Sequence, residues 1–286
     1  MKKIDQGTAF VREHAHLFQC PTCREPYERV EAHTLICPNG HTIDVNKKGS
    51  LNFLNHAVDT EYDDAMLEAR RRVLAAGLFD GIIKAVADQL PTEPQTLLDV
   101  GTGEGTPLAK LLDLRHNQDV GIGFDISKAG VNLGTQLDSP AFFMVADLAH
   151  LPFNENSLDA IVEFFSPSAY DEFNRVLKPG GRLVKVIPNA GYLHELREML
   201  YPVDSSNHTY SNEKVLTRFM ERYPQASQQT VTYTWDIPAD KYVDLLHMTP
   251  LHWGARPEAQ AQALAESTPL QRVTVDVTVL TVPQVD

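Results

Sequence analysis

The chain has 286 residues, 43% hydrophobic and 22% charged, which is typical of a globular protein with room for one α/β domain and a small module. No stretch approaches the roughly 18 continuous apolar residues of a membrane span, and the polar N-terminus lacks the apolar core of a signal peptide, so we expect a cytoplasmic protein without a membrane partner. The net charge of −13 argues against broad, nonspecific nucleic-acid binding, although residues 1–56 carry seven Lys or Arg against six Asp or Glu.

Every cysteine of the chain lies in this first segment, among short runs and turn-forming residues. Cys20, Cys23, Cys37 and His41 follow the spacing C-x2-C-x13-C-x3-H, in which two tight loops each offer a pair of ligands. The donor set suits a tetrahedral Zn²⁺ ion, and four protein ligands leave no open position, so the ion would be structural. His33 is the competing fourth ligand. An odd number of cysteines does not favour a disulfide framework, which leaves three unrelated buried thiols as the alternative.

A helical junction between residues 57 and 94 is predicted from the run 59–90, which is rich in Ala, Leu, Arg and Glu. Gly77 and Gly81 are expected to divide this run into two helices. Pro91 is expected to end it, because proline cannot continue a helix.

From residue 95 onward, short apolar runs alternate with helical patterns. Strands are expected at 96–101, 120–126, 141–146, 158–165, 182–188, 228–237 and 272–282. Helices are expected at 107–114, after the N-cap Ser127, and at 170–177, 212–223, 241–248 and 257–265. The last strand alternates strongly and is interpreted as an edge or hairpin strand. Repeated strand–helix units predict an α/β, Rossmann-like fold with a mostly parallel seven-stranded sheet.

A glycine-rich loop follows the first of these strands. The segment LLDVGTGEG places Gly101, Gly103 and Gly105 at the carboxyl edge of the sheet, where open α/β folds bind cofactors. A dinucleotide loop is the alternative, but here one residue separates the second and third glycines, whereas the dinucleotide fingerprint has two. Asp99 is placed to hold the amino acid part of S-adenosylmethionine (SAM), and Thr102 lies in the same loop.

The next strands end in further candidate SAM contacts. Asp125, followed by Ile126, can accept hydrogen bonds from both ribose hydroxyls, although an acid here is expected in NAD enzymes as well. Asp147, followed by Leu148, can accept the adenine amino group. Phe165 follows the fourth strand, beside the expected methyl group. The three acids in this order favour SAM as the cofactor.

The sequence also narrows the chemical class of the methyl acceptor. No cysteine outside the zinc cluster is available as a nucleophile, and the segment FFSPSA departs from the signature of exocyclic amino methylation. Ring nitrogen, oxygen or carboxylate acceptors remain. Ser166 and Pro167 are predicted to form the acceptor wall. Glu163, Asp171 and His247 are candidate bases, and no spacing selects one of them, so the catalytic base stays unassigned.

Together these segments resemble the 23S ribosomal RNA guanine-N1 methyltransferase family. The resemblance is carried by CPTC and CPNGH, by the helix containing ARRRVLAAG, by LLDVGTGEG and GFDISK, and by LLHMTPLHW. It implies a SAM-dependent enzyme that methylates N1 of a guanine in a 23S rRNA hairpin. It further implies an RNA-recognising zinc module at 1–56, a methyltransferase domain at 57–286, and members that can form homodimers.

Under this resemblance RNA would contact local basic groups, namely Arg12, Arg24, Lys47, Lys48 and the cluster Arg70, Arg71 and Arg72. A solvated helix face is the alternative for the arginine cluster. Trp253 could stack on a flipped base, but a core role is favoured. Two rival functions remain open. One is a SAM enzyme acting on a small molecule, and the other is a noncatalytic RNA-binding or assembly factor with a SAM fold.

Overall fold

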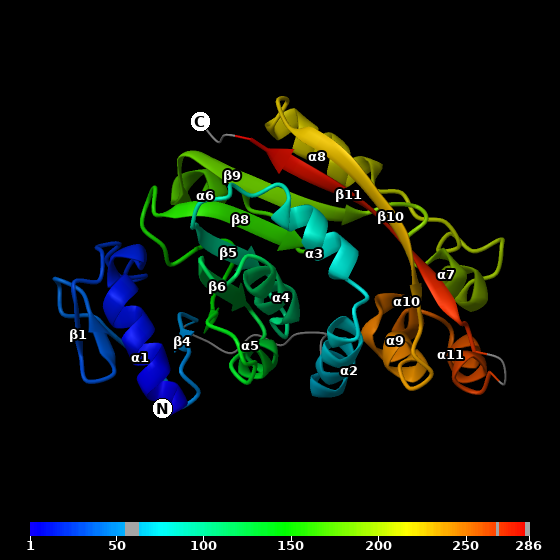
Figure 1. Ribbon diagram of the computed structural model, residues 1–286, viewed down its shortest axis with the longest axis horizontal. Coiled ribbons are helices and arrows are strands. Elements are labelled where there is room, and N and C mark those ends of the chain that lie inside the picture. The colour runs from blue at the N-terminus through cyan, green and yellow to red at the C-terminus, as the bar shows by residue number, and fades with distance from the viewer. Residues whose placement is uncertain (55–62, 267–268, 284–286) are drawn as a thin grey trace.

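An eight-stranded sheet forms the centre of the protein, as the computed structural model shows for residues 1–54, 63–266 and 269–283 (Figure 1). The strand order is β10-β11-β9-β8-β5-β6-β7-β4, and neighbours are parallel from β9 through to β4. β11 pairs antiparallel with both β9 and β10. The strands of this sheet are β4 (Leu51–Asn52), β5 (Thr96–Val100), β6 (Val120–Asp125), β7 (Phe142–Val145), β8 (Leu158–Phe164), β9 (Leu177–Pro188), β10 (Ser227–Asp236) and β11 (Arg272–Val282).

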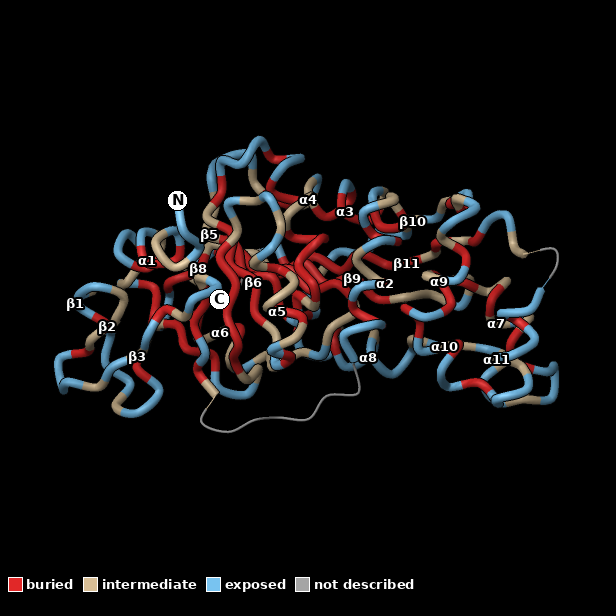
Figure 2. The backbone as a smooth tube through the Cα atoms, turned by 90° about the horizontal axis from the view of Figure 1, so that it is seen from below, coloured by how far each residue is buried: buried red, intermediate tan, exposed pale blue. Residues whose placement is uncertain are grey.

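Helices cover both faces of this sheet. The helices are α1 (Lys3–His14), α2 (Asp64–Ala75), α3 (Asp80–Ala87), α4 (Thr106–Leu114), α5 (Lys128–Gly134), α6 (Tyr170–Val176), α7 (His194–Leu200), α8 (Glu213–Arg222), α9 (Tyr242–Met248), α10 (Pro250–Trp253) and α11 (Pro257–Leu264), with a 3₁₀ turn at Ala15–Leu17. Because successive strand residues point to opposite faces, Leu97 belongs to the core beneath α2, α3 and α4, and Leu98 to the core beneath α1, α6 and α8. Seen from below, these buried strands run through the middle of the molecule (Figure 2).

The seven predicted strands are confirmed, and the eighth, β4, comes from the N-terminal segment. The last strand, β11, is not an edge strand, because it pairs on both sides and leaves β10 at the edge. Strand β9 begins at Leu177, five residues before its predicted start. Gly77 separates α2 from α3 as predicted, whereas Gly81 lies inside α3. There a side chain would collide with the Tyr233 ring, which explains the glycine by packing rather than by helix breaking.

The N-terminal segment packs against the central sheet and contributes one strand to it. It contains α1, which the sequence analysis missed, and a three-stranded antiparallel sheet of β1 (Arg29–Glu31), β2 (Thr34–Ile36) and β3 (Thr42–Asp44). The Phe10 ring of α1 stacks on Phe142 of β7 at 4.4 Å between centroids, and β4 pairs with β7. The predicted domain boundary at 56/57, and the beginning of the predicted junction helix, lie outside the described residues.

The order of the strands fixes where a ligand can bind. The chain passes from β5 outward to β6 and β7 on one side, and then returns to β8 on the other side of β5. Such a reversal opens a binding position at the carboxyl ends of β5, β6 and β8. Within the described ranges, no helix has the length and apolarity needed to cross a bilayer.

We expect Phe18→Ala to lower the free energy of unfolding by about 3–5 kcal/mol, because a large buried side chain is lost. Phe18 is fully buried, and its ring packs on Phe53, Phe142 and Phe153, which come from both parts of the chain. Urea denaturation followed by circular dichroism should still show one transition. Val215→Ala on the exposed side of α8 should change this free energy by less than about 0.5 kcal/mol. A separate early transition of the N-terminal segment would contradict the shared core.

Candidate active site and metal centre

The loop between β5 and α4 has the backbone that its glycines predict. Gly101, Gly103 and Gly105 all have left-handed backbone angles, with φ of 66°, 57° and 85°. A Cβ at Gly101 would lie 2.8 Å from Cβ of Ser166, so only glycine fits there. A Cβ at Gly103 would meet only the Arg70 side chain, at 3.9 Å. The loop backbone is therefore open at Gly103, as close approach of a ligand requires.

Asp99 is buried at the carboxyl end of β5, beneath this loop. Its Oδ2 accepts a hydrogen bond from Thr102 Oγ1 at 2.6 Å, and its Oδ1 has no partner among the described residues. Burial raises the pKa of Asp99 to about 7, and the nearby charge of Asp125 adds to the effect. A buried carboxylate oxygen without a donor is costly, so the site suits a ligand that brings a cationic N–H group.

The acids at the ends of β6 and β7 differ in how firmly they are held. Asp125 Oδ2 accepts from the Gly103 N–H and Oδ1 from the Ser127 N–H, both at 2.8 Å. This fixes the carboxylate beside the glycine loop, although burial raises its pKa. Asp147 is half-exposed, and its Oδ1 accepts from the Ala149 N–H at 2.9 Å. The structure brings Asp99 and Asp125 together and leaves Asp147 at the rim.

Arg70 lies against the glycine loop, which sequence reasoning did not predict. The guanidinium lies 5.4 Å from the centre of the Phe79 ring, and its charge favours the ionised forms of Asp99, Glu104 and Asp125. Arg70 makes no ion pair or hydrogen bond within the described part of the chain. Glu104 is itself fully buried, with Oε1 unpartnered. The Arg70 charge thus acts on three acids, and the Arg71 charge also acts on Glu104.

Three aromatic rings extend this cluster. Phe165 packs on Phe79 at 5.3 Å between centroids and on Tyr192 at 5.1 Å. Phe79 precedes α3 and Tyr192 follows β9, so only the fold brings them to the end of β8. Sequence reasoning missed both residues, because neither belongs to a motif.

The predicted acceptor wall lies beside the loop, but the candidate bases do not reach it. Ser166 is half-buried with its Cβ against Gly101, and Pro167 is exposed. Glu163 is fully buried and paired with Lys185. Asp171 is 97% exposed and pairs with an arginine on α8.

The remaining residues predicted to contact the cofactor or the substrate lie on several different elements. The third candidate base, His247, lies on α9 with its ring 6.0 Å from that of His252. Ile126 is 37% exposed beside Asp125, and Leu148 packs on the core that α1 and α6 share. The preference for Trp253 as a core residue is wrong, because it is 40% exposed on α10.

The metal-binding residues predicted from spacing converge in the N-terminal segment. The ligand atoms of Cys20, Cys23, Cys37 and His41 all lie within 4.8 Å of one another. Cys37 Sγ is 3.6 Å from Cys23 Sγ and 3.5 Å from His41 Nδ1. A tetrahedral ion with bonds of about 2.3 Å would separate its sulfur ligands by about 3.8 Å, so the site fits zinc. His33 lies outside the cluster, with Nδ1 2.8 Å from Thr8 Oγ1.

The parallel sheet, the glycine loop and the acids at its edge define a class I SAM-dependent methyltransferase. Residues 98–185, from β5 to β9, match the methyltransferase domain family. A SAM-dependent methyltransferase from Aquifex aeolicus has a similar solved structure, with a TM-score of 0.46 and 16% identity over 77% of this chain and 99% of that one.

Two relatives match nearly the whole length of the chain. A Bacillus subtilis protein, YxjB, provisionally named a 23S rRNA (guanine-N1)-methyltransferase, is 36% identical over 92% of this chain and 96% of its own. The 23S rRNA (guanine(748)-N1)-methyltransferase of Streptomyces fradiae is 27% identical over 91% of this chain and 94% of its own. The chain therefore belongs to the 23S rRNA (guanine-N1)-methyltransferase family.

We expect the SAM affinity to rise with pH up to about 7, because the pKa of Asp99 is about 7 without ligand and a cationic ligand should lower it. Below that pH, binding must remove a proton, so Kd should fall by up to about tenfold per pH unit between about pH 5.5 and 7. Titration calorimetry measures this slope.

Asp99→Asn should flatten this pH dependence, and Asp147→Asn, which changes a half-exposed acid, should keep it. An equal slope in wild type and Asp99→Asn would show that Asp99 does not exchange a proton on binding.

We expect about one zinc ion per chain, measured by inductively coupled plasma mass spectrometry, and its loss in Cys37→Ala, which removes one of four ligands. Hydrogen exchange should then rise in β1 to β3. His33→Ala should retain the ion, because His33 lies outside the cluster. Full zinc content in Cys37→Ala would refute the assigned ligands.

Proposed function

We propose that this methyltransferase modifies N1 of a guanine in 23S rRNA. The observation that carries the proposal is the match to relatives named for this reaction, which extends over the N-terminal segment as well as the catalytic domain. A structural zinc ion would stabilise that segment, which has too small a core to fold readily alone. An rRNA substrate would place the enzyme in the cytoplasm. A homodimer remains a prediction of the family resemblance.

The edge residues can orient the two reactants. SAM, when bound, supplies an electrophilic methyl group on a sulfonium centre. Asp99 would hold its ammonium group, and Arg70 its carboxylate, since these charges match. Asp125 would accept the ribose hydroxyls with its remaining lone pairs. Phe165 and Ser166 would then lie on the path of the guanine, and in-line attack by N1 would depend on how they position it.

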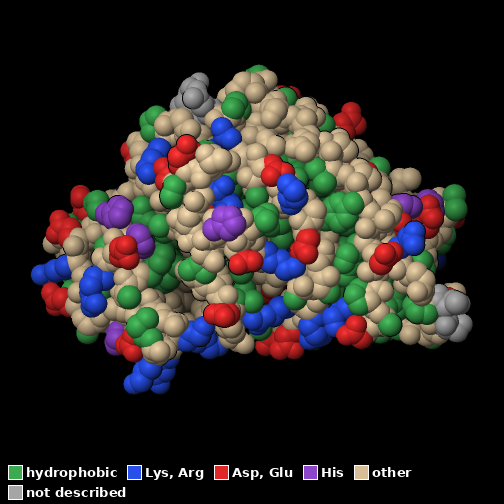
Figure 3. All heavy atoms as spheres, in the orientation of Figure 1, with side chains coloured by type: hydrophobic (Ala, Val, Ile, Leu, Met, Phe, Trp, Pro, Cys, Tyr) green, Lys and Arg blue, Asp and Glu red, His purple; other side chains and the backbone are tan. Residues whose placement is uncertain are grey.

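A basic margin offers one place for the RNA backbone. Several Lys and Arg side chains lie along the lower edge of the molecule, beneath α1, α5 and α2, with some Asp and Glu side chains between them (Figure 3). Lys3 and Lys48 line a pocket of about 280 Å³ against the end of α5, and Arg71 donates to the Leu133 carbonyl of the same helix at 3.4 Å. In a chain of net charge −13, a local basic margin can bind phosphates where the rest repels them.

The three arginines of α2 have different surroundings, so we propose a different role for each of them. Arg71 keeps its predicted place in RNA binding, whereas Arg70 is reassigned to SAM. Arg72 forms a bidentate pair with Asp244 of α9, which favours a structural role.

We expect purified enzyme and labelled SAM to methylate 23S rRNA from a strain lacking the gene, and nucleoside mass spectrometry should detect 1-methylguanosine. Asp125→Ala should reduce the product strongly, because the cofactor loses its ribose contact. Lys48→Ala with Arg71→Ala should raise KM for RNA and leave SAM binding intact.

Two outcomes would favour the rivals. Methylation of a small molecule with unmodified rRNA would favour the small-molecule enzyme. Absence of SAM binding at millimolar concentration would favour the noncatalytic factor.

A further inference from the structure

A buried ion pair lies directly behind the predicted acceptor wall. Glu163 on β8 and Lys185 on β9 are direct partners in the parallel pairing of these strands. Their side chains are 0% and 4% exposed, and Lys185 Nζ lies 3.3 Å from Glu163 Oε1. Burial raises the pKa of Glu163 to about 7, and the Lys185 charge opposes this rise. The pair is therefore held in the protein interior.

The other hydrogen bonds of Lys185 go to the acceptor loop. Nζ donates to the Ser166 carbonyl and to Ser168 Oγ, both at 2.9 Å. Ser168 Oγ donates in turn to Glu163 Oε1 at 2.8 Å. With Glu163, these contacts use all three ammonium donors. The network thus ties the loop after β8 to two central strands.

The same loop contains a strained backbone. Phe165 has φ of 62°, a left-handed conformation that costs a residue with a side chain roughly 1–2 kcal/mol. Such a conformation persists only where its surroundings hold it. Here the turn directs the Phe165 ring between Phe79 and Tyr192, and it sets Ser166 against Gly101.

We propose that Glu163 and Lys185 are positioning residues that hold the loop after β8, with Phe165 in its strained conformation and Ser166 against Gly101, so that the loop can place the methyl acceptor. This rests on the proposed function insofar as the acceptor is the rRNA guanine. A buried ion pair is seldom a source of net stability, because desolvation offsets the attraction. The fixed geometry of the loop is the property that hydrophobic side chains at these two positions could not reproduce.

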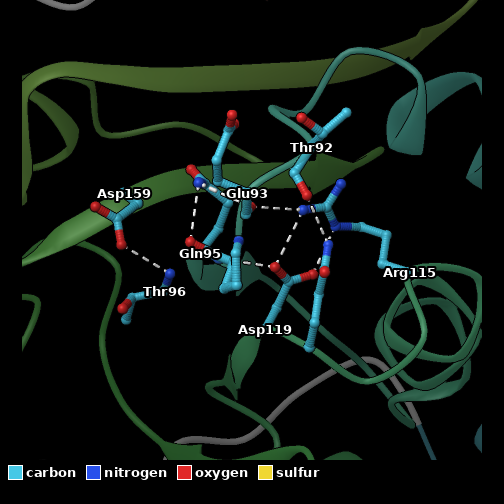
Figure 4. A network of polar contacts seen from close by, with 9 residues as sticks. Thr92, Glu93, Gln95, Thr96, Arg115, Asp119 and Asp159 are labelled. Atoms are coloured by element: carbon cyan, nitrogen blue, oxygen red, sulfur yellow. Dashed lines mark hydrogen bonds and ion pairs between the residues drawn. The ribbon is translucent and has the colours of Figure 1, made fainter.

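A second buried pair provides a matched control at the opposite edge of the sheet (Figure 4). Arg115 and Asp119 are 7% and 0% exposed, and Arg115 Nε lies 2.5 Å from Asp119 Oδ2. Asp119 Oδ1 accepts from the Gln95 N–H at 2.8 Å, just before β5 begins. This pair is equally buried but lies at the amino ends of β5 and β6, far from the acceptor loop.

The test compares the full-length variants Lys185→Met and Glu163→Gln/Lys185→Met with Arg115→Met and Arg115→Met/Asp119→Asn. We expect kcat for rRNA methylation to fall about 10- to 100-fold in both Lys185 variants, with Kd for SAM changed by less than about threefold. The double variant should be thermally more stable than Lys185→Met, but its kcat should remain reduced to the same extent. The control variants should lose stability and keep kcat within about twofold.

Hydrogen exchange gives a readout independent of the substrate. The amides of residues 165–169 other than Pro167 should exchange about tenfold faster in the Lys185 variants and at the wild-type rate in the controls. Wild-type kcat in the folded double variant, or unchanged exchange at 165–169, would overturn the proposal. If the wild-type enzyme leaves rRNA unmodified, the proposed function fails, and exchange alone decides whether the pair holds the loop.

Discussion

One hydrogen bond, from the Gly103 N–H to Asp125 Oδ2 at 2.8 Å, joins the ends of the two strands that form the cofactor edge. The neighbouring Thr102 N–H donates to the Phe124 carbonyl of β6 at 2.9 Å, which holds the loop against that strand. The bond from Gly103 aligns Asp125 with the loop and leaves the other face of Gly103 open. Asp99, beneath the loop, then lacks a donor for Oδ1. Recognition of a cationic nucleoside follows from this arrangement of backbone and acids.

The acceptor side depends on a second constraint of the same kind. Phe165 has the same left-handed backbone as the glycine loop, but it carries a side chain and is therefore strained, so it needs support from its surroundings. The buried Lys185 supplies hydrogen bonds to that segment, and Ser166 meets Gly101 across the edge. The cofactor loop and the acceptor loop therefore meet at this edge of the sheet. The N-terminal segment adds β4 to the same sheet, which fixes its orientation relative to this edge.

Much of this structure was predictable because it is encoded locally. Strand alternation, the glycine spacing and the ligand spacing from Cys20 to His41 each depend on residues close together in sequence. The errors arise where distant segments decide the outcome. Helix α1 has a weak sequence signal and is stabilised by packing, as the stacking of Phe10 on Phe142 illustrates. The position of Arg70 beside Gly103 likewise depends on packing between α2 and the glycine loop, which no local pattern reveals.

The most direct measurement is the SAM affinity of Gly103→Ala. An alanine there keeps the N–H that binds Asp125, and its Cβ meets only the Arg70 side chain. The free energy of unfolding without SAM should therefore fall by no more than about 1–2 kcal/mol, the usual penalty for a left-handed alanine. Titration calorimetry should show SAM affinity reduced at least about tenfold, because the methyl group enters the space that the cofactor needs. Wild-type affinity in this folded variant would contradict binding of SAM across the loop.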